Sequence, residues 1–242
     1  ALVAPGLVDL GVFAIDKPAF HFGGITRAAL MPDQSPRLDL PSRVSYIAKS
    51  GKPDFWVHPL AAATRDLAGA EIAELGLMRE AGARGVATVL QWIANSGTML
   101  RLLQYAAMLD LVVVAHPEDA ALVGNAVATA GEVATRRGLP SAPAEAESIA
   151  LTRDIALAEM AGARIHFRQV TTRAGLEIVR RAKARGLTVT AEAAPHHFAL
   201  NETAIGDYRT FAKMAPPLRD AADVEALVQG LKDGAIDFMA QD

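Results

Sequence analysis

The stretch Leu111-Val112-Val113-Val114-Ala115-His116 is an unbroken apolar run rich in β-branched residues, which is typical of a buried strand in a parallel sheet. It follows a segment over Ser96–Leu109 whose apolar residues have helical spacing. The same alternation of short apolar runs and longer helical segments continues in both directions along the chain. This alternation predicts a series of parallel βα units.

Eight strands are predicted in this way. They lie near Leu7–Val12, Ile25–Met31, Asp54–His58, Gly85–Leu90, Leu111–His116, Ala163–Val170, Leu187–Glu192 and Ala235–Ala240. The predicted helices are Arg43–Ser50, Ala68–Ala81, Ser96–Leu109, Asp119–Arg137, Ala144–Ala161, Thr172–Ala184 and Ala221–Lys232. This pattern favours an α/β fold, a TIM-type (β/α)8 barrel, as one domain over residues 1–242. An open doubly wound sheet is the alternative, but no glycine-rich dinucleotide loop follows the first strand.

Two places depart from a complete barrel. The link between the first two strands is short, is interrupted by Pro18, Gly23 and Gly24, and contains no predicted helix. A parallel crossover normally needs about 12 or more residues and a helix. The last predicted strand is not followed by a closing helix, and the chain does not begin with methionine. We therefore expect that a segment after about Lys17, a C-terminal portion and the start of the protein are absent from this sequence.

The composition is that of a core-rich globular protein, with 51% hydrophobic residues, 5% aromatic residues and a mean hydropathy of +0.20. The absence of cysteine excludes disulfides and thiolate chemistry. The net charge of −3 and the lack of a basic block argue against nucleic acid as a partner. No apolar run approaches the ~20 residues that span a bilayer, and no signal peptide is recognisable, so the expected compartment is the cytoplasm.

Catalytic groups of a barrel lie at the carboxyl ends of its strands. The polar residues at or just after the predicted strand ends are Asp33, His58, Gln91, His116, Gln169, Glu192, His196, His197 and Asp242. Histidine has a claim to function there because imidazole is both a metal ligand and an acid–base group near neutral pH. Asp242, at the end of the eighth strand, is favoured as a general base over a solvated residue.

Each histidine also has a structural interpretation. His116 fits a ligand or substrate contact and a structural hydrogen bond equally well. His166 lies inside a strand, three residues before its end, and is predicted to be a hydrogen-bonded core residue. His196 and His197 are adjacent and are expected to face different ways, so we predict that they anchor a loop rather than share a metal ion.

Several motifs occur in a fixed order along the chain. They are Pro5-Gly6-Leu7-Val8-Asp9, Gly23-Gly24-Ile25-Thr26 with Met31-Pro32-Asp33, Ala115-His116-Pro117-Glu118-Asp119, residues 166–172, residues 192–198, residues 213–219 and residues 237–242. With these motifs the chain resembles dihydroorotases of the bacterial type I class, in the amidohydrolase superfamily, over essentially its whole length. The resemblance implies a barrel with a metal-dependent site that hydrolyses a cyclic amide in pyrimidine biosynthesis.

The resemblance also shows what is altered at the first and fourth strands. The family's two strand-one histidine ligands correspond to Gly11 and Phe13, and its substrate-clamping arginine corresponds to Ile15. Neither glycine nor phenylalanine offers a ligand atom to a metal. The bridging acid or modified lysine of strand four would fall within residues 86–92, which contain no Asp, Glu or Lys.

Further family positions are altered on later strands. The second histidine of strand six corresponds to Gln169, and the substrate-binding asparagines correspond to Asp33 and Ala215. Of the family's metal-site positions, only His116 and Asp242 match. A catalytic zinc site typically keeps three protein ligands and a water molecule, so two ligands fall short of it.

We therefore predict a pseudo-enzyme, a dihydroorotase-like protein without catalysis and without a cofactor. The resemblance implies that such a protein can serve as a structural partner of aspartate transcarbamoylase, and a homo-oligomer is a further expectation. One alternative is an active cyclic amidohydrolase whose zinc is held by His116, Asp242 and one of Gln169, Glu192 or His166. Another is a carboxylate-binding sensor, although Arg168 and Arg219 are predicted to form surface ion pairs rather than an anion site.

Overall fold

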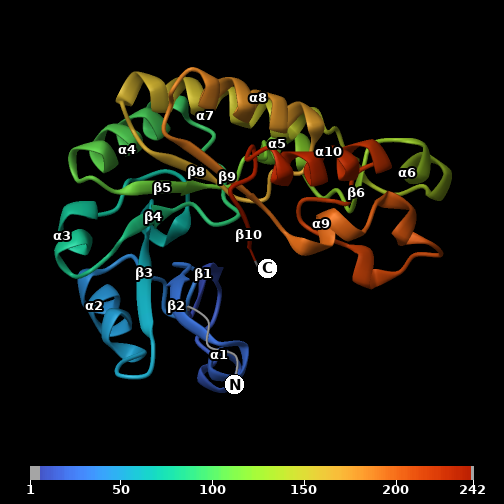
Figure 1. Ribbon diagram of the computed structural model, residues 1–242. Coiled ribbons are helices and arrows are strands. Elements are labelled where there is room, and N and C mark those ends of the chain that lie inside the picture. The colour runs from blue at the N-terminus through green and yellow to red at the C-terminus, as the bar shows by residue number, and fades with distance from the viewer. Residues whose placement is uncertain (1–5, 241–242) are drawn as a thin grey trace. The chain divides into compact units, whose positions relative to one another are not determined.

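The computed structural model describes residues 6–240. Eight of the strands in this range alternate with helices along the chain (Figure 1). The chain divides into two compact units, residues 6–114 with residue 240, and residues 115–239. None of the helices within residues 6–240 is long and apolar enough to cross a membrane. That residues 1–242 form a single domain stays a prediction.

The first unit is built on five strands that pair in parallel and in chain order. They are β1 (Leu7–Val12), β2 (Ile25–Leu30), β3 (Trp56–Ala62), β4 (Gly85–Ala87) and β5 (Val112–Ala115). The helices between them are α1 (Lys17–Gly23), α2 (Pro41–Ser50), the 3-10 turn η1 (Arg65–Leu67), α3 (Leu75–Glu80) and α4 (Ser96–Met108). Each predicted strand of this part of the sequence is confirmed, although β3 continues through Pro59 to Ala62, beyond its predicted end.

Two predictions for the connections of the first unit are wrong. The link after β1 does contain a helix, α1, which begins at an Asp16 cap and ends at Gly24 in the left-handed region. Pro18 lies in its first turn, where a missing N–H breaks no helical hydrogen bond. The helix predicted over Ala68–Ala81 is reduced to α3, because the backbone takes positive φ angles at residues 66, 67 and 69.

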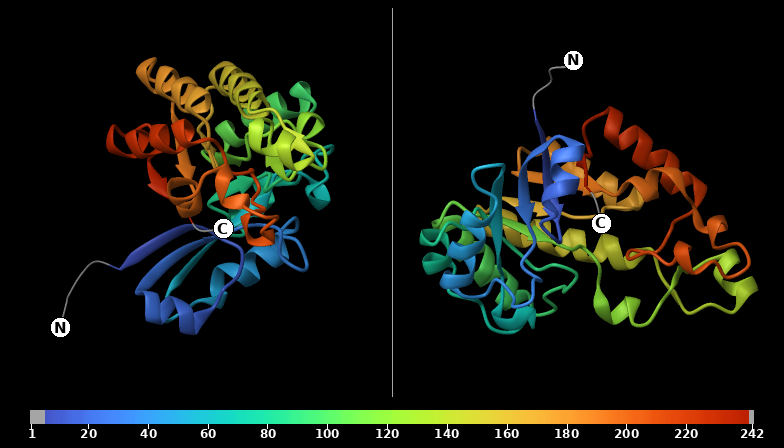
Figure 2. Two further views of the ribbon diagram at one scale, coloured as in Figure 1. Left: turned by 90° about the vertical axis from the view of Figure 1, so that its right-hand side faces the viewer. Right: turned by 90° about the horizontal axis from the view of Figure 1, so that it is seen from below.

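The second unit contains the strands β8 (Ile165–Phe167), β9 (Val189–Ala193) and β10 (Phe238–Met239), which also pair in parallel and in chain order. Its helices are α5 (Ala120–Val123), α6 (Glu132–Arg137), α7 (Glu145–Ala161), α8 (Arg173–Ala184), α9 (Pro195–Ala199) and α10 (Ala221–Lys232). Two 3-10 turns complete it, η2 (Glu202–Ile205) and η3 (Thr210–Ala212). Helices α7, α8 and α10 lie side by side, with α7 against β8 and α8 against β9 (Figures 1 and 2).

The helix predicted over Asp119–Arg137 is wrong. The chain forms α5, then a two-residue strand β6 (Ala128–Thr129), then α6, and β6 pairs with β7 (Ser141–Ala142). Strands of two residues leave no periodic pattern in the sequence, so β6 and β7 were not predicted. A small core joins one residue each of β6, α6, η2 and η3 with one residue of the following loop: Ala128, Ala134, Ile205, Ala212 and Leu218. We call β6, β7, α6, η2 and η3 together the side lobe.

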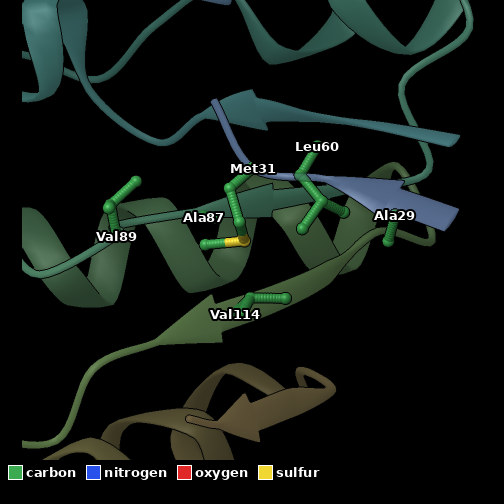
Figure 3. Packing of buried hydrophobic residues seen from close by; sticks show 6 residues of the cluster. All are labelled: Ala29, Met31, Leu60, Ala87, Val89 and Val114. Atoms are coloured by element: carbon green, nitrogen blue, oxygen red, sulfur yellow. The ribbon is translucent and has the colours of Figure 1, made fainter. Parts of the chain in front are cut away.

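The interior of the first unit is apolar where its strands end. One buried cluster consists of Ala29, Met31, Leu60, Ala87, Val89 and Val114, whose side chains point toward one another (Figure 3). Each comes from a strand, β2 to β5, or from the residues just after it. Removing such side chains from water is the main stabilising term of this unit.

Gly85 allows β3, β4 and β5 to approach one another closely. A Cβ atom there would lie 2.9 Å from Cγ1 of Val112 and 3.1 Å from Cδ2 of Leu60. We expect Gly85→Ala to lower the free energy of unfolding by about 1–3 kcal/mol through overpacking, as measured by urea unfolding. Gly23→Ala is the matched control, since its nearest contact atoms are 3.9 Å away on Ile25. Equal losses in the two variants would contradict the packing argument.

Candidate functional site

The first strand ends without a ligand group. Gly11 is buried, and its backbone N–H donates to Oδ1 of Asp9 over 3.2 Å. Phe13, the next residue but one, packs its ring against the apolar cluster of the first unit. The side-chain amide of Gln34 donates to the carbonyl oxygens of Phe13 and Met31 over 2.9 and 3.0 Å, which fixes the ends of β1 and β2. The positions of the family's strand-one ligands are therefore part of a packed apolar end.

The ends of the other strands in the first unit carry few side chains that could bind a metal ion or a substrate. Asp33 is exposed in the loop after β2, and β4 is followed by the buried residues Thr88 and Val89. His58 was predicted to end its strand, but it lies inside β3. Burial lowers the pKa of His58, and the nearby charges of Arg27 and Arg84 act in the same direction. A neutral imidazole in mid-strand is a structural residue in this unit.

The second unit contains a chain of buried ionic groups that starts at His116. Nε2 of His116 lies 3.3 Å from Oε2 of Glu118. The other oxygen of Glu118 lies 3.6 Å from Nη2 of Arg219, and the same nitrogen lies 3.7 Å from Oε2 of Glu147. All four side chains are buried. His116 thus lies against the carboxylate of Glu118, whose negative charge is balanced by Arg219. This contact supports the structural interpretation of His116.

Glu147, on α7, fastens the segment that follows β8. Its two oxygens accept hydrogen bonds from the backbone N–H and the hydroxyl of both Thr171 and Thr172, over 2.5 to 3.0 Å. Complete burial raises the pKa of Glu147, while Arg219 and the threonine hydrogen bonds act in the opposite direction. The hydroxyl of Thr172 in turn accepts from the N–H of Gly175 and caps α8. One buried carboxylate therefore positions the start of α8.

A second buried cluster surrounds Glu192, near the end of β9. Nε2 of His166 lies 3.1 Å from one carboxylate oxygen, and Nε of Arg168 donates to the other over 3.0 Å. Nδ1 of His166 lies 2.9 Å from the Thr190 hydroxyl, and its ring stacks on Phe238 at 4.9 Å between centroids. The prediction that His166 is a hydrogen-bonded core residue is confirmed. Both proposed unorthodox ligands from this region, His166 and Glu192, bind each other.

The remaining predicted site residues are spread through the second unit. Gln169 is buried and adopts a φ of 54° just after β8, and Ala215 is exposed and precedes the cis peptide bond to Pro216. Asp242 lies outside the described residues. Gly11, Phe13 and Asp33 belong to the first unit, whereas His116, Gln169 and Ala215 belong to the second.

His197 anchors a loop, as predicted. Nε2 of His197 lies 3.1 Å from the carbonyl oxygen of Pro216, which ties α9 to the following loop. The ring of His196, on the same short helix α9, lies with its centroid 4.2 Å from that of His197 and is tilted by 47°, and only His197 is buried. The pKa of His197 is lowered to about 3, chiefly by burial; the charges of His196 and Arg219 act in the same direction, and the Pro216 hydrogen bond acts against them.

The sequence-based view of the arginines is wrong. Arg168 and Arg219 were predicted as surface ion pairs, yet they are only 1% and 2% exposed and bind glutamates inside the second unit. A signal was present, since Arg168 stands at a predicted strand end and Arg219 closes a Pro-Pro-Leu-Arg turn motif. Glu118 and Glu147 were not singled out. Glu147 lies on a helix and carries no local pattern that distinguishes it from exposed glutamates.

Comparison with known protein families decides the relationship. The model of the dihydro-orotase-like family matches residues 2–175 of the chain. The chain belongs to the dihydroorotase-like family. It is 43% identical to a dihydroorotase of Pelotomaculum thermopropionicum and 42% identical to one of Geobacter sp. strain M21, in each case over 100% of this chain and 60% of the relative. The chain therefore spans about three fifths of the length of these curated relatives.

Solved structures confirm the predicted fold class of the dihydroorotase-like chain. The L-hydantoinase of Arthrobacter aurescens matches 98% of this chain and 57% of its own chain, with a TM-score of 0.81 and 22% identity. The D-hydantoinase of Thermus sp. matches the same shares with a TM-score of 0.76 and 24% identity. At these identities the likeness supports the fold only.

The family resemblance implies a metal ion, and the described residues do not fit one. Within residues 6–240, no group of three or more His, Asp or Glu side chains is arranged to hold a metal. Phe13 packs in an apolar cluster, and Glu192 is bound by both Arg168 and His166. An arginine beside a carboxylate opposes a metal cation there through like-charge repulsion.

Proposed function

We propose that this dihydroorotase-like chain is catalytically inactive and serves pyrimidine biosynthesis in the cytoplasm as a structural partner of aspartate transcarbamoylase. The observation that carries the proposal is the packing at the end of β1. A phenylalanine, Phe13, stands at a family ligand position and packs against a buried apolar cluster that extends over β2 to β5. A polar side chain at position 13 would lie against this cluster, where an unpaired polar group is costly.

The ion pairs of the second unit support the same proposal. His166 and Arg168 both contact Glu192, and Glu118 and Glu147 share Arg219. Each of these buried carboxylates therefore has a counter-charge supplied by the chain itself, without a bound cation. The active-enzyme alternative needs His166 or Glu192 to leave these contacts, or Gln169 as its third ligand. The sensor alternative requires Arg168 or Arg219 to leave a carboxylate, so these contacts support neither alternative.

The first test is an assay of the full-length protein with added zinc for the reversible interconversion of dihydroorotate and carbamoyl-aspartate. The dihydroorotase of Pelotomaculum thermopropionicum is the positive control. We expect no turnover above the uncatalysed rate and no stoichiometric zinc by elemental analysis, because two of the usual three ligands are too few for a catalytic site. Turnover that a chelator abolishes would overturn the proposed inactivity.

The structural role is tested separately, by sedimentation of the full-length protein mixed with aspartate transcarbamoylase from the same organism. We expect a complex that sediments faster than either protein alone, and a transcarbamoylase with a higher melting temperature. A folded protein that forms no complex would overturn the structural role while leaving the inactivity intact.

A further inference from the structure

The side lobe carries a small pocket with an apolar floor, which we call the side-lobe pocket. Its volume is about 150 Å³. Val127 and Leu139 line it and are half-buried, and Ile205 and Ala212 line it from the buried core of the lobe. Leu139 also packs against that core. The floor of the pocket is therefore the outer surface of a packed core, which keeps the shape of the pocket fixed.

The size of the side-lobe pocket decides what kind of group it can hold. An apolar cavity of about 150 Å³ holds one benzene ring, whereas sites for drug-sized ligands typically measure about 300–1,000 Å³. One apolar side chain of a partner protein has the smaller of these sizes. Side chains that fill such pockets are the anchors that dominate the binding energy of many interfaces. The pocket thus fits an anchor side chain of a partner protein better than a free ligand of cofactor size.

Two cations without a carboxylate partner lie at the rim of this pocket. Arg209 and Lys213 line it and are exposed, and neither side chain forms an ion pair or a hydrogen bond within residues 6–240. Asp207, the acidic residue closest to them in sequence, is paired with Arg137 over 3.2 Å instead. Charges at the rim of an interface favour a partner surface of opposite charge. We therefore expect carboxylates beside the anchor side chain of the partner.

The turn that forms this rim, residues 208–213, also presents two aromatic rings to water. Phe211 is 93% exposed and Tyr208 is 60% exposed. The Tyr208 hydroxyl donates to the carbonyl of Arg137 over 2.9 Å, and the guanidinium of Arg137 lies 5.7 Å from the centroid of the Tyr208 ring. Ala212, next to Phe211, is buried in the core of the lobe. Because the backbone that carries both rings is already held in place, a partner can bury them at a small cost in conformational entropy.

We propose that aspartate transcarbamoylase docks on the side-lobe pocket, with one of its apolar side chains in the pocket and neighbouring carboxylates on Arg209 and Lys213. This inference rests on the proposed function, which requires a docking surface for the transcarbamoylase but does not locate one. The pocket, the two unpaired cations and the exposed rings all lie on residues 208–213 and the core beneath them. Aromatic rings and arginine around an apolar pocket are the composition of interface hot spots.

The test is sedimentation of the full-length protein with aspartate transcarbamoylase from the same organism, from which the dissociation constant of the complex is obtained. Arg209→Glu/Lys213→Glu reverses the rim charges, and Thr210→Trp places a large ring at an exposed position of the pocket lining. We expect each to raise the dissociation constant by at least about ten-fold, with the effect of charge reversal largest at low salt. Phe211→Ala, which removes an exposed ring, should raise it as well.

Two control variants change the same kinds of group outside the pocket lining. Lys49→Glu/Lys232→Glu makes the same change of charge at two exposed lysines, and Phe22→Ala removes a ring that is 98% exposed in the first unit. We expect both controls to bind the transcarbamoylase like the wild type. Controls that weaken the complex as much as the pocket variants would contradict the assignment of the docking surface. Circular dichroism establishes that each variant is folded.

The outcomes for the docking surface and for the structural role are distinguishable. Pocket variants that bind the transcarbamoylase as tightly as the wild type would overturn the docking surface and leave the structural role intact. A wild-type protein that forms no complex would overturn the structural role, and the docking surface with it. Pocket variants that change the sedimentation of this protein without the transcarbamoylase would show that a second copy occupies the pocket, which would also overturn the proposal.

Discussion

Arg168→Met is expected to lower the free energy of unfolding by about 3–5 kcal/mol, because it leaves the carboxylate of Glu192 buried without its main counter-charge. Nε of Arg168 donates to Oε1 of Glu192 over 3.0 Å, and the two residues are each only 1% exposed. His166 remains as a partner of the other oxygen but is charged only when protonated. In a protein of this size the loss corresponds to a fall in melting temperature of roughly 10 °C.

Two further variants separate lost charge pairing from lost packing. Arg168→Met/Glu192→Gln removes both charges and keeps an oxygen that accepts from His166, so we expect it to recover at least half of the loss. Arg180→Met breaks the ion pair between Arg180 and Asp233, whose side chains are 33% and 48% exposed. Because exposed ion pairs contribute little, this variant should lose less than about 1 kcal/mol in the free energy of unfolding. Urea unfolding of the wild type and the three variants measures these differences in the free energy of unfolding. A double variant no more stable than Arg168→Met would show that packing, not charge, is responsible.

The fold was predictable from the sequence because its strands are short apolar runs with few alternatives. All eight predicted strands are present, and β1 has its predicted bounds. Connections were less predictable. Residues 68–81 have helical composition, but positive φ angles at residues 66, 67 and 69 interrupt the start of this segment, and the helix begins only at Leu75. The side lobe was missed because β6 and β7 each contribute only two residues to pairing, which is below what periodicity can detect.

For the candidate site, only the loss of metal-binding side chains could be predicted from the sequence. Gly11 and Phe13 could be recognised as lacking ligand atoms without any coordinates, since the residue type alone decides that point. The side chains that contact each candidate ligand could not be predicted from the sequence. Glu192 was a candidate ligand in the sequence, and only the structure shows that Arg168 and His166 bind it. Long-range pairs of this kind depend on which strands lie side by side, and local patterns do not specify them.

His197 makes the stability of the protein sensitive to acid. Its pKa is lowered to about 3 in the folded chain, chiefly by burial, whereas an unfolded histidine has a pKa of 6.5. Above pH 6.5 the imidazole is neutral in both states, and its hydrogen bond to Pro216 contributes fully. Between pH 6.5 and 3 the unfolded chain takes up a proton that the folded chain excludes, so stability falls as the pH falls. The expected loss is about 1.4 kcal/mol for each pH unit, or about 3 kcal/mol by pH 4.

His197→Gln isolates this contribution, because the glutamine amide can still donate to the Pro216 carbonyl but does not titrate. We expect the variant to be somewhat less stable than the wild type at pH 7 and to lose less stability between pH 6.5 and 4. The measurement is urea unfolding of both proteins across that range at constant ionic strength. Burial raises the pKa of Glu147 and so favours the folded state at low pH, but this effect is common to both proteins and cancels in their difference. Parallel stability curves would show that His197 is protonated as readily in the folded chain as in the unfolded one.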